Sequence, residues 1–298
     1  MPFAEFEEKQ YEIAFNIELG FAGPVFPSGQ VLEELTGYDA VADPSANHVL
    51  WRILSVPRPP GVRLLPTHWT PSERRSQPPA TRLPMHPVSF IAQFKRPEYL
   101  QGSGAAQYRF WKQPYYRFRR TKQQHAQLRR LEGRLVGVAK VVYASPAFHR
   151  YADLERAQLR GNVVDLTGFV SPIRMGRHAV WTYTSPGLFG RGNPDGEELR
   201  FATFEALFAG ARRVSGQELA NRESLREHLG TLAAASRAVA ASRGRAVDSW
   251  ISEVEQMADV SPEILDGVRD FATIQSLAIA MGASWWLLDG DELTPTWP

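Results

Sequence analysis

Apolar positions near the N-terminus recur at the spacing of a helix. Within residues 4–19 the large apolar side chains fall near one face, and they are Phe6, Tyr11, Phe15 and Leu19. An interval of about four residues follows the helical period, so an amphipathic helix is predicted here. Glu12 and Glu18 flank its apolar face. Residues 20–29 contain three glycines and two prolines, which predicts a loop after the helix.

A period of two residues appears at residues 88–95, which predicts a strand. The apolar residues at positions 90, 92 and 94 share one face of that strand. Gln93 and Lys95 follow Ile91 on the other face, because side chains alternate along a strand. The pattern therefore presents an amide and an amine on one face, one pleat apart.

The remaining segments alternate between the two periods as far as residue 200 and then become helical. Strands are predicted from Gly37-Tyr38-Asp39-Ala40-Val41 onward and over residues 48–56, 136–143, 163–170 and 179–183. Helices are predicted from the N-cap Thr121 to about Leu131 and from Ser145-Pro146 to about Leu159. Residues 187–196 are predicted to be a loop. From Phe201 the pattern predicts helices, with Trp285, Trp286 and Leu287 packing this tail onto the body.

This order predicts an α/β fold with a helical C-terminal region. Residues 1–200 are assigned to one α/β domain with a central mixed sheet flanked by helices. Residues 57–87 are rich in proline, arginine and serine and are predicted to be a long insertion in that domain. Residues 201–298 are assigned to the helical region, which packs on the core or serves in assembly.

Composition excludes several classes of protein. The chain has 298 residues, of which 43% are hydrophobic and 22% charged, and this is typical of a globular protein rather than a disordered one. It has no cysteine, which excludes disulfides and cysteine nucleophiles. The seven histidines lack the spacing of a zinc hydrolase. No apolar run approaches about 20 residues and no signal peptide is visible, so a cytoplasmic protein without a membrane partner is expected.

The small net charge of +2 conceals a strongly uneven distribution. Residues 1–43 hold nine acidic side chains and one basic side chain, whereas residues 44–160 hold 21 basic and five acidic ones. A basic central region is what a polyanion-binding surface needs, but charge alone favours solvated faces that pair with the acidic ends. Only five of the 34 basic residues are lysines, so Lys95 stands out at its position.

The order of these motifs resembles the PD-(D/E)XK nuclease superfamily. The matching residues are Asp39 in Gly37-Tyr38-Asp39-Ala40 and the run Gln93-Phe94-Lys95-Arg96, after a helix that carries Glu12. The chain looks like the variant of this family whose motif reads D…QxK. The resemblance covers about residues 4–170 and implies a restriction-endonuclease-like core. The gap from Asp39 to Gln93 is longer than in the compact motif and requires the insertion to loop out.

The resemblance also implies roles for these side chains around Mg²⁺ or Mn²⁺. Asp39, Gln93 and Glu12 are the implied metal ligands, since these ions prefer oxygen donors. Lys95 is the implied catalytic amine that orients the attacking water or stabilises developing charge. Asp43 and Glu18 are nearby alternatives to Asp39 and Glu12. A polar strand edge, a turn residue and a solvated helix face are the structural explanations of the same residues.

The segment Gln107–Arg120 interleaves aromatic and basic residues. Such a segment can stack on bases and contact phosphates, although its aromatics also suit a core. The predicted phosphate contacts are Arg117, Arg119, Arg120 and Lys122.

Three hypotheses follow from the sequence. The first is a metal-dependent endonuclease acting on nucleic acid, DNA being favoured over RNA, which by analogy serves as the effector of a prokaryotic anti-phage defence system. The second is a catalytically inactive nucleic-acid-binding or scaffold protein of the same fold. The third is a subunit of a larger complex, or a homo-oligomer, assembled through the C-terminal helices.

Overall fold

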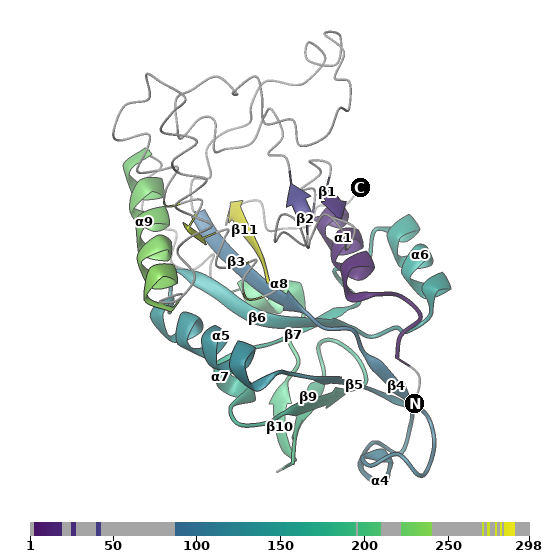
Figure 1. Ribbon diagram of the computed structural model, residues 1–298. Coiled ribbons are helices and arrows are strands. Elements are labelled where there is room, and N and C mark those ends of the chain that lie inside the picture. Colours follow the sequence, from purple (N-terminus) through teal and green to yellow (C-terminus); the bar gives the residue numbers. More distant parts are fainter. Residues whose placement is uncertain are drawn as a thin grey trace, which may run out of the picture.

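Figure 1 shows the computed structural model of the chain. The structure describes residues 3–19, 25–27, 40–42, 87–194, 196–209, 222–239 and 283–289, together with positions 270, 273, 274, 278 and 281. These parts form a mixed α/β fold with two main sheets and several helices. Within the described ranges, no helix is both long and apolar enough to cross a bilayer.

A four-stranded sheet forms the centre of the fold (Figure 1). Its strands, in spatial order, are β11 (Ser284–Asp289), β3 (Pro87–Phe94), β6 (Ala139–Pro146) and β7 (Thr167–Val170). Strands β3 and β6 are parallel, and the other neighbours are antiparallel. A parallel pair requires a long crossover, and here it contains α4 (Tyr108–Trp111), β5 (Tyr115–Arg119) and α5 (Lys122–Arg134).

The alternating pattern of β3 divides the interior into two apolar clusters. Phe90, Ala92 and Phe94 pack against helices α1 (Glu8–Glu18), α6 (Tyr151–Arg160) and α8 (Phe204–Phe208). Ile91 lies in the cluster on the opposite face, which includes residues of α5 and α9 (Arg222–Val239). The sheet is therefore covered on both faces, as is usual for parallel strands.

A second, five-stranded antiparallel sheet packs on the α5 side. Its strands, in spatial order, are β10 (Glu197–Arg200), β9 (Phe189–Asn193), β8 (Val180–Tyr183), β5 and β4 (Glu98–Leu100). Trp181 and Tyr183 of β8 and Phe118 of β5 belong to the same apolar cluster as Ile91. Strand β4 follows β3 after three residues, so the chain passes directly from one sheet into the other.

Several predicted elements are confirmed. The helix predicted at residues 4–19 is α1, and the strand predicted at 88–95 is β3. Thr121 is the N-cap of α5, as predicted. A short strand, β2 (Ala40–Ala42), begins one residue after Asp39 and pairs with β1 (Val25–Pro27), which lies within the predicted loop. The strand predicted at 48–56 and residues 57–86 of the insertion lie outside the described residues.

Three predictions are wrong in part. The helix predicted from Ser145-Pro146 to about Leu159 is α6, but it begins at Tyr151, because Ser145 and Pro146 end β6 and pair with β7. The segment 187–196 contains strand β9 and the turn into β10 instead of an open loop. The C-terminal region is not helical throughout, since it ends in strand β11.

The C-terminal region shares its core with the rest of the chain. Strand β11 pairs with β3 along six residues. Trp285 lies in the cluster with Ile91, and Trp286 stacks on Phe90 with ring centroids 4.9 Å apart. The tail therefore packs on the body, as predicted, but it does so as an edge strand of the central sheet. The proposed boundary at residue 200 stays a prediction.

Candidate functional site

The predicted Gln-x-Lys motif lies at the carboxyl end of β3. Gln93 pairs in register with Tyr143 of β6 and is 1% exposed. Its amide oxygen, Oε1, has no hydrogen-bond partner in the described part of the chain. A buried acceptor without a donor costs about 1–3 kcal/mol of stability, so such an atom requires an explanation. It is an oxygen ligand of the kind that a hard cation prefers.

Lys95 follows immediately after β3. Its backbone is held on β6, because its amide donates to the Ala144 carbonyl at 2.8 Å and its carbonyl accepts from the Ser145 hydroxyl at 2.9 Å. The side-chain amine donates to Oε1 of Gln124 on α5 at 3.5 Å. Burial lowers the pKa of Lys95, and the nearby Glu8 carboxylate opposes that shift. The amine is thus oriented and partly removed from water.

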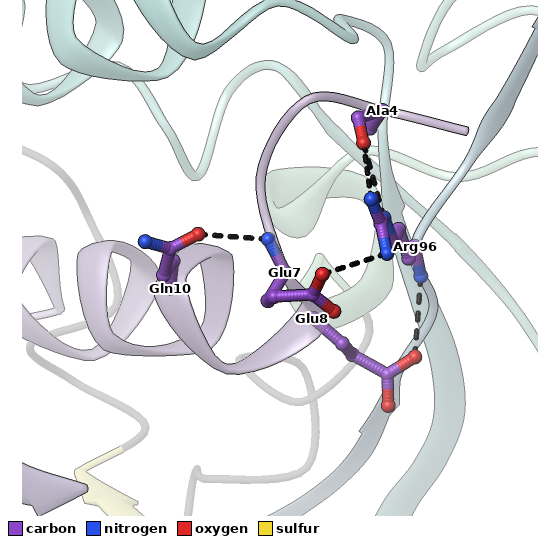
Figure 2. Close-up of polar contacts among 5 residues, drawn as sticks. All are labelled: Ala4, Glu7, Glu8, Gln10 and Arg96. Atoms are coloured by element: carbon purple, nitrogen blue, oxygen red, sulfur yellow. Dashed lines mark hydrogen bonds and ion pairs between the residues drawn. The ribbon is translucent and has the colours of Figure 1, made fainter. Parts of the chain in front are cut away.

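Glu8, in the first turn of α1, is the carboxylate that is electrostatically coupled to Lys95. Burial raises the pKa of Glu8, while Lys95 and the backbone N–H of Arg96 lower it. That N–H donates to Glu8 Oε2 at 3.2 Å (Figure 2). A carboxyl whose pKa is raised by burial beside a buried amine is a common feature of functional sites.

Arg96 fastens the beginning of α1 to the end of β3 (Figure 2). Its guanidinium donates twice to the Ala4 carbonyl, at 3.1 and 2.6 Å, and once to Glu7 at 2.9 Å. The Glu7 backbone N–H in turn donates to Oε1 of Gln10 at 2.8 Å, which caps the helix. These bonds fix the position of Glu8 relative to Lys95.

Glu12 lies on the other side of the sheet from Gln93. Its carboxylate accepts from the Ser284 hydroxyl and forms an ion pair with Lys9 at 3.1 Å. Ser284 is paired with Ala92, and directly opposed residues of antiparallel strands share a face. Gln93 follows Ala92 and therefore points to the opposite face. This placement argues against one cation bound by both Glu12 and Gln93. Glu8 differs from Glu12 in that it accepts from the backbone N–H of Arg96, the residue after Lys95.

Glu8 was not identified from the sequence. It lies one helical turn before Glu12, and the partners of the two carboxylates differ: Glu8 accepts from the Arg96 N–H, whereas Glu12 accepts from Ser284 and pairs with Lys9. The run Lys95-Arg96 was a signal in the sequence that pointed to an acidic neighbour such as Glu8, because a partly buried cation is stabilised by a nearby carboxylate.

Asp39, the predicted carboxylate ligand, lies outside the described residues. Among the described residues, no three histidine, aspartate or glutamate side chains come close enough together to hold a metal ion. Among the described residues, the support for a cation at this site is therefore the Gln93 amide oxygen, because it is a buried oxygen donor without a hydrogen-bond partner there.

The four predicted phosphate contacts have different surroundings. Arg117 is buried and ion-paired with Glu98, which argues against a phosphate contact, whereas Arg119 pairs with the same carboxylate at 3.3 Å with a side chain that is 60% exposed. Arg120 donates to the carbonyls of His178 and Arg177 at 2.7 and 2.9 Å. Lys122, at the start of α5, is exposed.

Beside Gln93, a polar chain crosses the apolar cluster. The Tyr143 hydroxyl lies 3.0 Å from Nδ1 of His125, whose Nε2 lies 2.5 Å from the Gly176 carbonyl. The carbonyl can only accept, so Nε2 carries the proton and Nδ1 accepts from the tyrosine. Burial lowers the pKa of His125 to about 4 and raises that of Tyr143. Both groups are therefore neutral near pH 7.

Comparison of the chain with protein-family models, with curated proteins and with solved structures finds no match.

Proposed function

We propose that the protein is a metal-dependent nuclease with a restriction-endonuclease-like core, and that it hydrolyses phosphodiester bonds of DNA in preference to RNA. The observation that carries the proposal is the end of β3. There, a buried Gln93 oxygen without a hydrogen-bond partner in the described part of the chain precedes, by one pleat, a partly buried Lys95. The positions of α1 before β3, and of α5 before a β6 that is parallel to β3, support the proposal. Strand β2, which follows Asp39, pairs with β1 rather than with the central sheet.

The cation in this proposal is Mg²⁺ or Mn²⁺, which when bound neutralises charge on the phosphate and activates water. Gln93 contributes one oxygen ligand, and Asp39 is the expected carboxylate ligand. Glu8 is proposed as the further acidic group in place of Glu12, because Glu8 is coupled to Lys95. A cation bound beside Glu8 would lower the pKa of this carboxyl, since a positive charge favours the charged form.

Lys95 acts through its amine. The Gln124 oxygen orients the ammonium, and Glu8 keeps it charged against the effect of burial. A charged amine in a partly dry site donates a stronger hydrogen bond to a phosphate oxygen or an attacking water than it does in bulk water. A lysine suits this position better than an arginine because its charge is compact.

The test is cleavage of a labelled oligonucleotide with and without Mg²⁺. Lys95→Ala and Asp39→Ala are expected to abolish cleavage, whereas Lys140→Ala, near the opposite end of β6, keeps it. Circular dichroism checks that each variant is folded. Cleavage at the wild-type rate by folded Lys95→Ala and Asp39→Ala would overturn the proposal.

A second candidate is a nucleic-acid-binding or scaffold protein that keeps the fold without catalysis. It is favoured by the position of Glu12, which faces away from Gln93. This candidate predicts binding that weakens with salt, is indifferent to EDTA and leads to no cleavage.

A further inference from the structure

The five-stranded sheet has one face turned away from the central sheet, here called the outer face. Trp181 and Tyr183 of β8 point into the shared core. Thr182, between them, therefore belongs to the outer face, as do its cross-strand neighbours Arg117 and Arg191. The outer face thus carries a row of polar and basic positions across β5, β8 and β9.

Helix α4 lies on this outer face. The indole N–H of Trp111 donates to the Thr182 hydroxyl at 3.3 Å. Trp111 also packs with Tyr115 and Leu100, which are outer-face positions of β5 and β4. The helix therefore adds its aromatic residues to the basic row.

Two flat stacks result from this arrangement. The Arg191 guanidinium lies over the Phe110 ring, with Cζ 3.9 Å from the ring centroid. Phe189 stacks on Trp111 at 5.4 Å with the ring planes 15° apart. Phe110 and Phe189 are themselves in contact, with centroids 6.1 Å apart, so the two stacks are neighbours. Phe189 is 42% exposed, which leaves an aromatic surface open to solvent on a rigid backing.

Basic side chains lie on the same face as the exposed ring. Arg200 is the direct cross-strand neighbour of Phe189 and is exposed. Nε of Arg191 is buried and has no hydrogen-bond partner in the described part of the chain. Arg119, which pairs with Glu98 and lies towards the other end of the sheet, adds an exposed guanidinium on the same face. Glu198 is the acidic residue opposite Arg191.

We propose that the outer face binds single-stranded nucleic acid, with one base stacked on Phe189 and backbone phosphates next to Arg200 and Arg119. Aromatic rings beside basic side chains form the usual surface for unpaired bases, since every base has a flat face and every link carries a negative charge. In a duplex the base faces are covered by neighbouring pairs, so the same ring finds no partner. The role of this strand as a substrate rests on the proposed nuclease function, whereas its binding does not.

The experiment measures fluorescence anisotropy of labelled single-stranded DNA, single-stranded RNA and duplex DNA of one sequence, in EDTA, with the full-length chain. Phe189→Ser is expected to weaken single-strand binding at least about 5-fold, as loss of one stacked base does. Its matched control, Leu188→Ser, replaces an adjacent side chain that is 54% exposed and is expected to bind like the wild type.

The contribution of the Arg200 charge is tested by measuring the same binding at several salt concentrations. Arg200→Gln is expected to make the dependence of log K on log salt shallower by about 0.7, the value for one phosphate contact on a single strand. Arg160→Gln, exposed at the end of α6, is the control with an unchanged slope. Preference for the DNA or the RNA strand identifies the natural partner, and either preference supports the inference.

Equal affinity for duplex and single strand, binding of neither, or equal binding by Phe189→Ser and Leu188→Ser would overturn the inference. Cleavage assays of the wild type with Mg²⁺ separate it from the nuclease proposal. If the wild type binds the single strand at Phe189 but cleaves nothing with Mg²⁺, the nuclease proposal fails and the binding face stands. If the wild type cleaves with Mg²⁺ and Phe189→Ser binds normally, the binding face fails alone.

Discussion

At Gln93 the proposed chemistry uses an amide oxygen that lowers the stability of the fold. The sequence placed it on a face with Lys95, but its burial and its oxygen without a hydrogen-bond partner among the described residues emerge only from the packing of β6 and α5 around it. A structural role alone gives no reason for an amide here, because an apolar side chain of the same size leaves no polar atom unpaired.

Replacing Gln93 with methionine is therefore expected to raise the free energy of unfolding by about 1–3 kcal/mol, since the unpaired oxygen is removed. The same variant is expected to lose metal-dependent cleavage. Urea denaturation and the oligonucleotide assay measure the two effects. Gln158→Met on the exposed side of α6 serves as the control, with neither property changed. A less stable Gln93→Met would show that the amide has a partner in the native protein.

Two histidines should make the protein sensitive to mild acid. Burial lowers the pKa values of His125 and His228 to about 4. His228 lies 2.9 Å from the Ser89 hydroxyl through Nε2, and that hydroxyl also accepts from the Trp285 indole at 3.1 Å. Protonation of either ring therefore replaces an acceptor with a donor inside the core.

The direction in which the free energy of unfolding changes with pH follows from the linkage between protonation and folding. Each histidine has a lower pKa in the folded chain than in the unfolded chain, so its contribution is present above pH 6.5 and is lost as the pH falls towards 4. The loss is about 3 kcal/mol for each histidine over that interval. Denaturant titrations at pH 7, 6, 5 and 4.5 measure it, and His228→Gln is expected to flatten the curve. A wild-type free energy that is constant from pH 7 to 4.5 would contradict this account.

At the scale of elements, local periodicity predicted α1 and β3 correctly. At the hairpin of β9 and β10, the glycine content led to the wrong prediction of a loop. Gly190 and Gly192 of β9 suggested a loop, yet both lie in a strand because large rings cover them. A β-carbon at Gly190 would lie 2.4 Å from the Trp181 ring, and one at Gly192 would lie 2.4 Å from the His178 ring. Such glycines mark a close approach rather than a turn, and only the packed structure distinguishes the two cases.

Gly190→Ala is accordingly expected to destabilise the protein by about 1–3 kcal/mol, because the Trp181 ring is held in the core and must move. Gly102→Ala is the matched control, since a β-carbon there meets no atom within 4 Å. Thermal melts of the two variants compare the effects. Equal melting temperatures for Gly190→Ala and the wild type would indicate that β9 and β8 lie further apart.

For the whole molecule, the decisive feature is the strand that the C-terminal region contributes. Strand β11 covers the edge of β3, and its two tryptophans reach the clusters on both faces of the sheet. The helix period dominates the sequence from residue 201, so this strand was not predicted. Its partner, β3, is nearly 200 residues earlier in the chain, and pairing at such a distance leaves no local signature.

Truncation before Ser284 is expected to prevent stable folding, because it exposes the edge of β3 and removes Trp285 and Trp286 from the core. Loss of a single large aromatic residue already costs about 3–5 kcal/mol. Truncation after Asp289, which keeps β11, is the control. Circular dichroism and size-exclusion chromatography compare the two chains. A monomeric, cooperatively unfolding chain that ends before Ser284 would refute the proposed role of β11.

The sequence by itself determined the local features: the helix that carries Glu8 and Glu12, the strand with Gln93 and Lys95 on one face, and the alternation that sorts core from surface. These depend on backbone periods of 3.6 and 2, which a few neighbouring residues suffice to express. Only the tertiary structure decided that Glu8 rather than Glu12 is coupled to Lys95, that Arg117 is buried against Glu98, and that Phe189 lies exposed beside Arg200. Those outcomes depend on which elements pack together. Packing gives side chains of the same type different partners and different exposure, which the sequence pattern does not show.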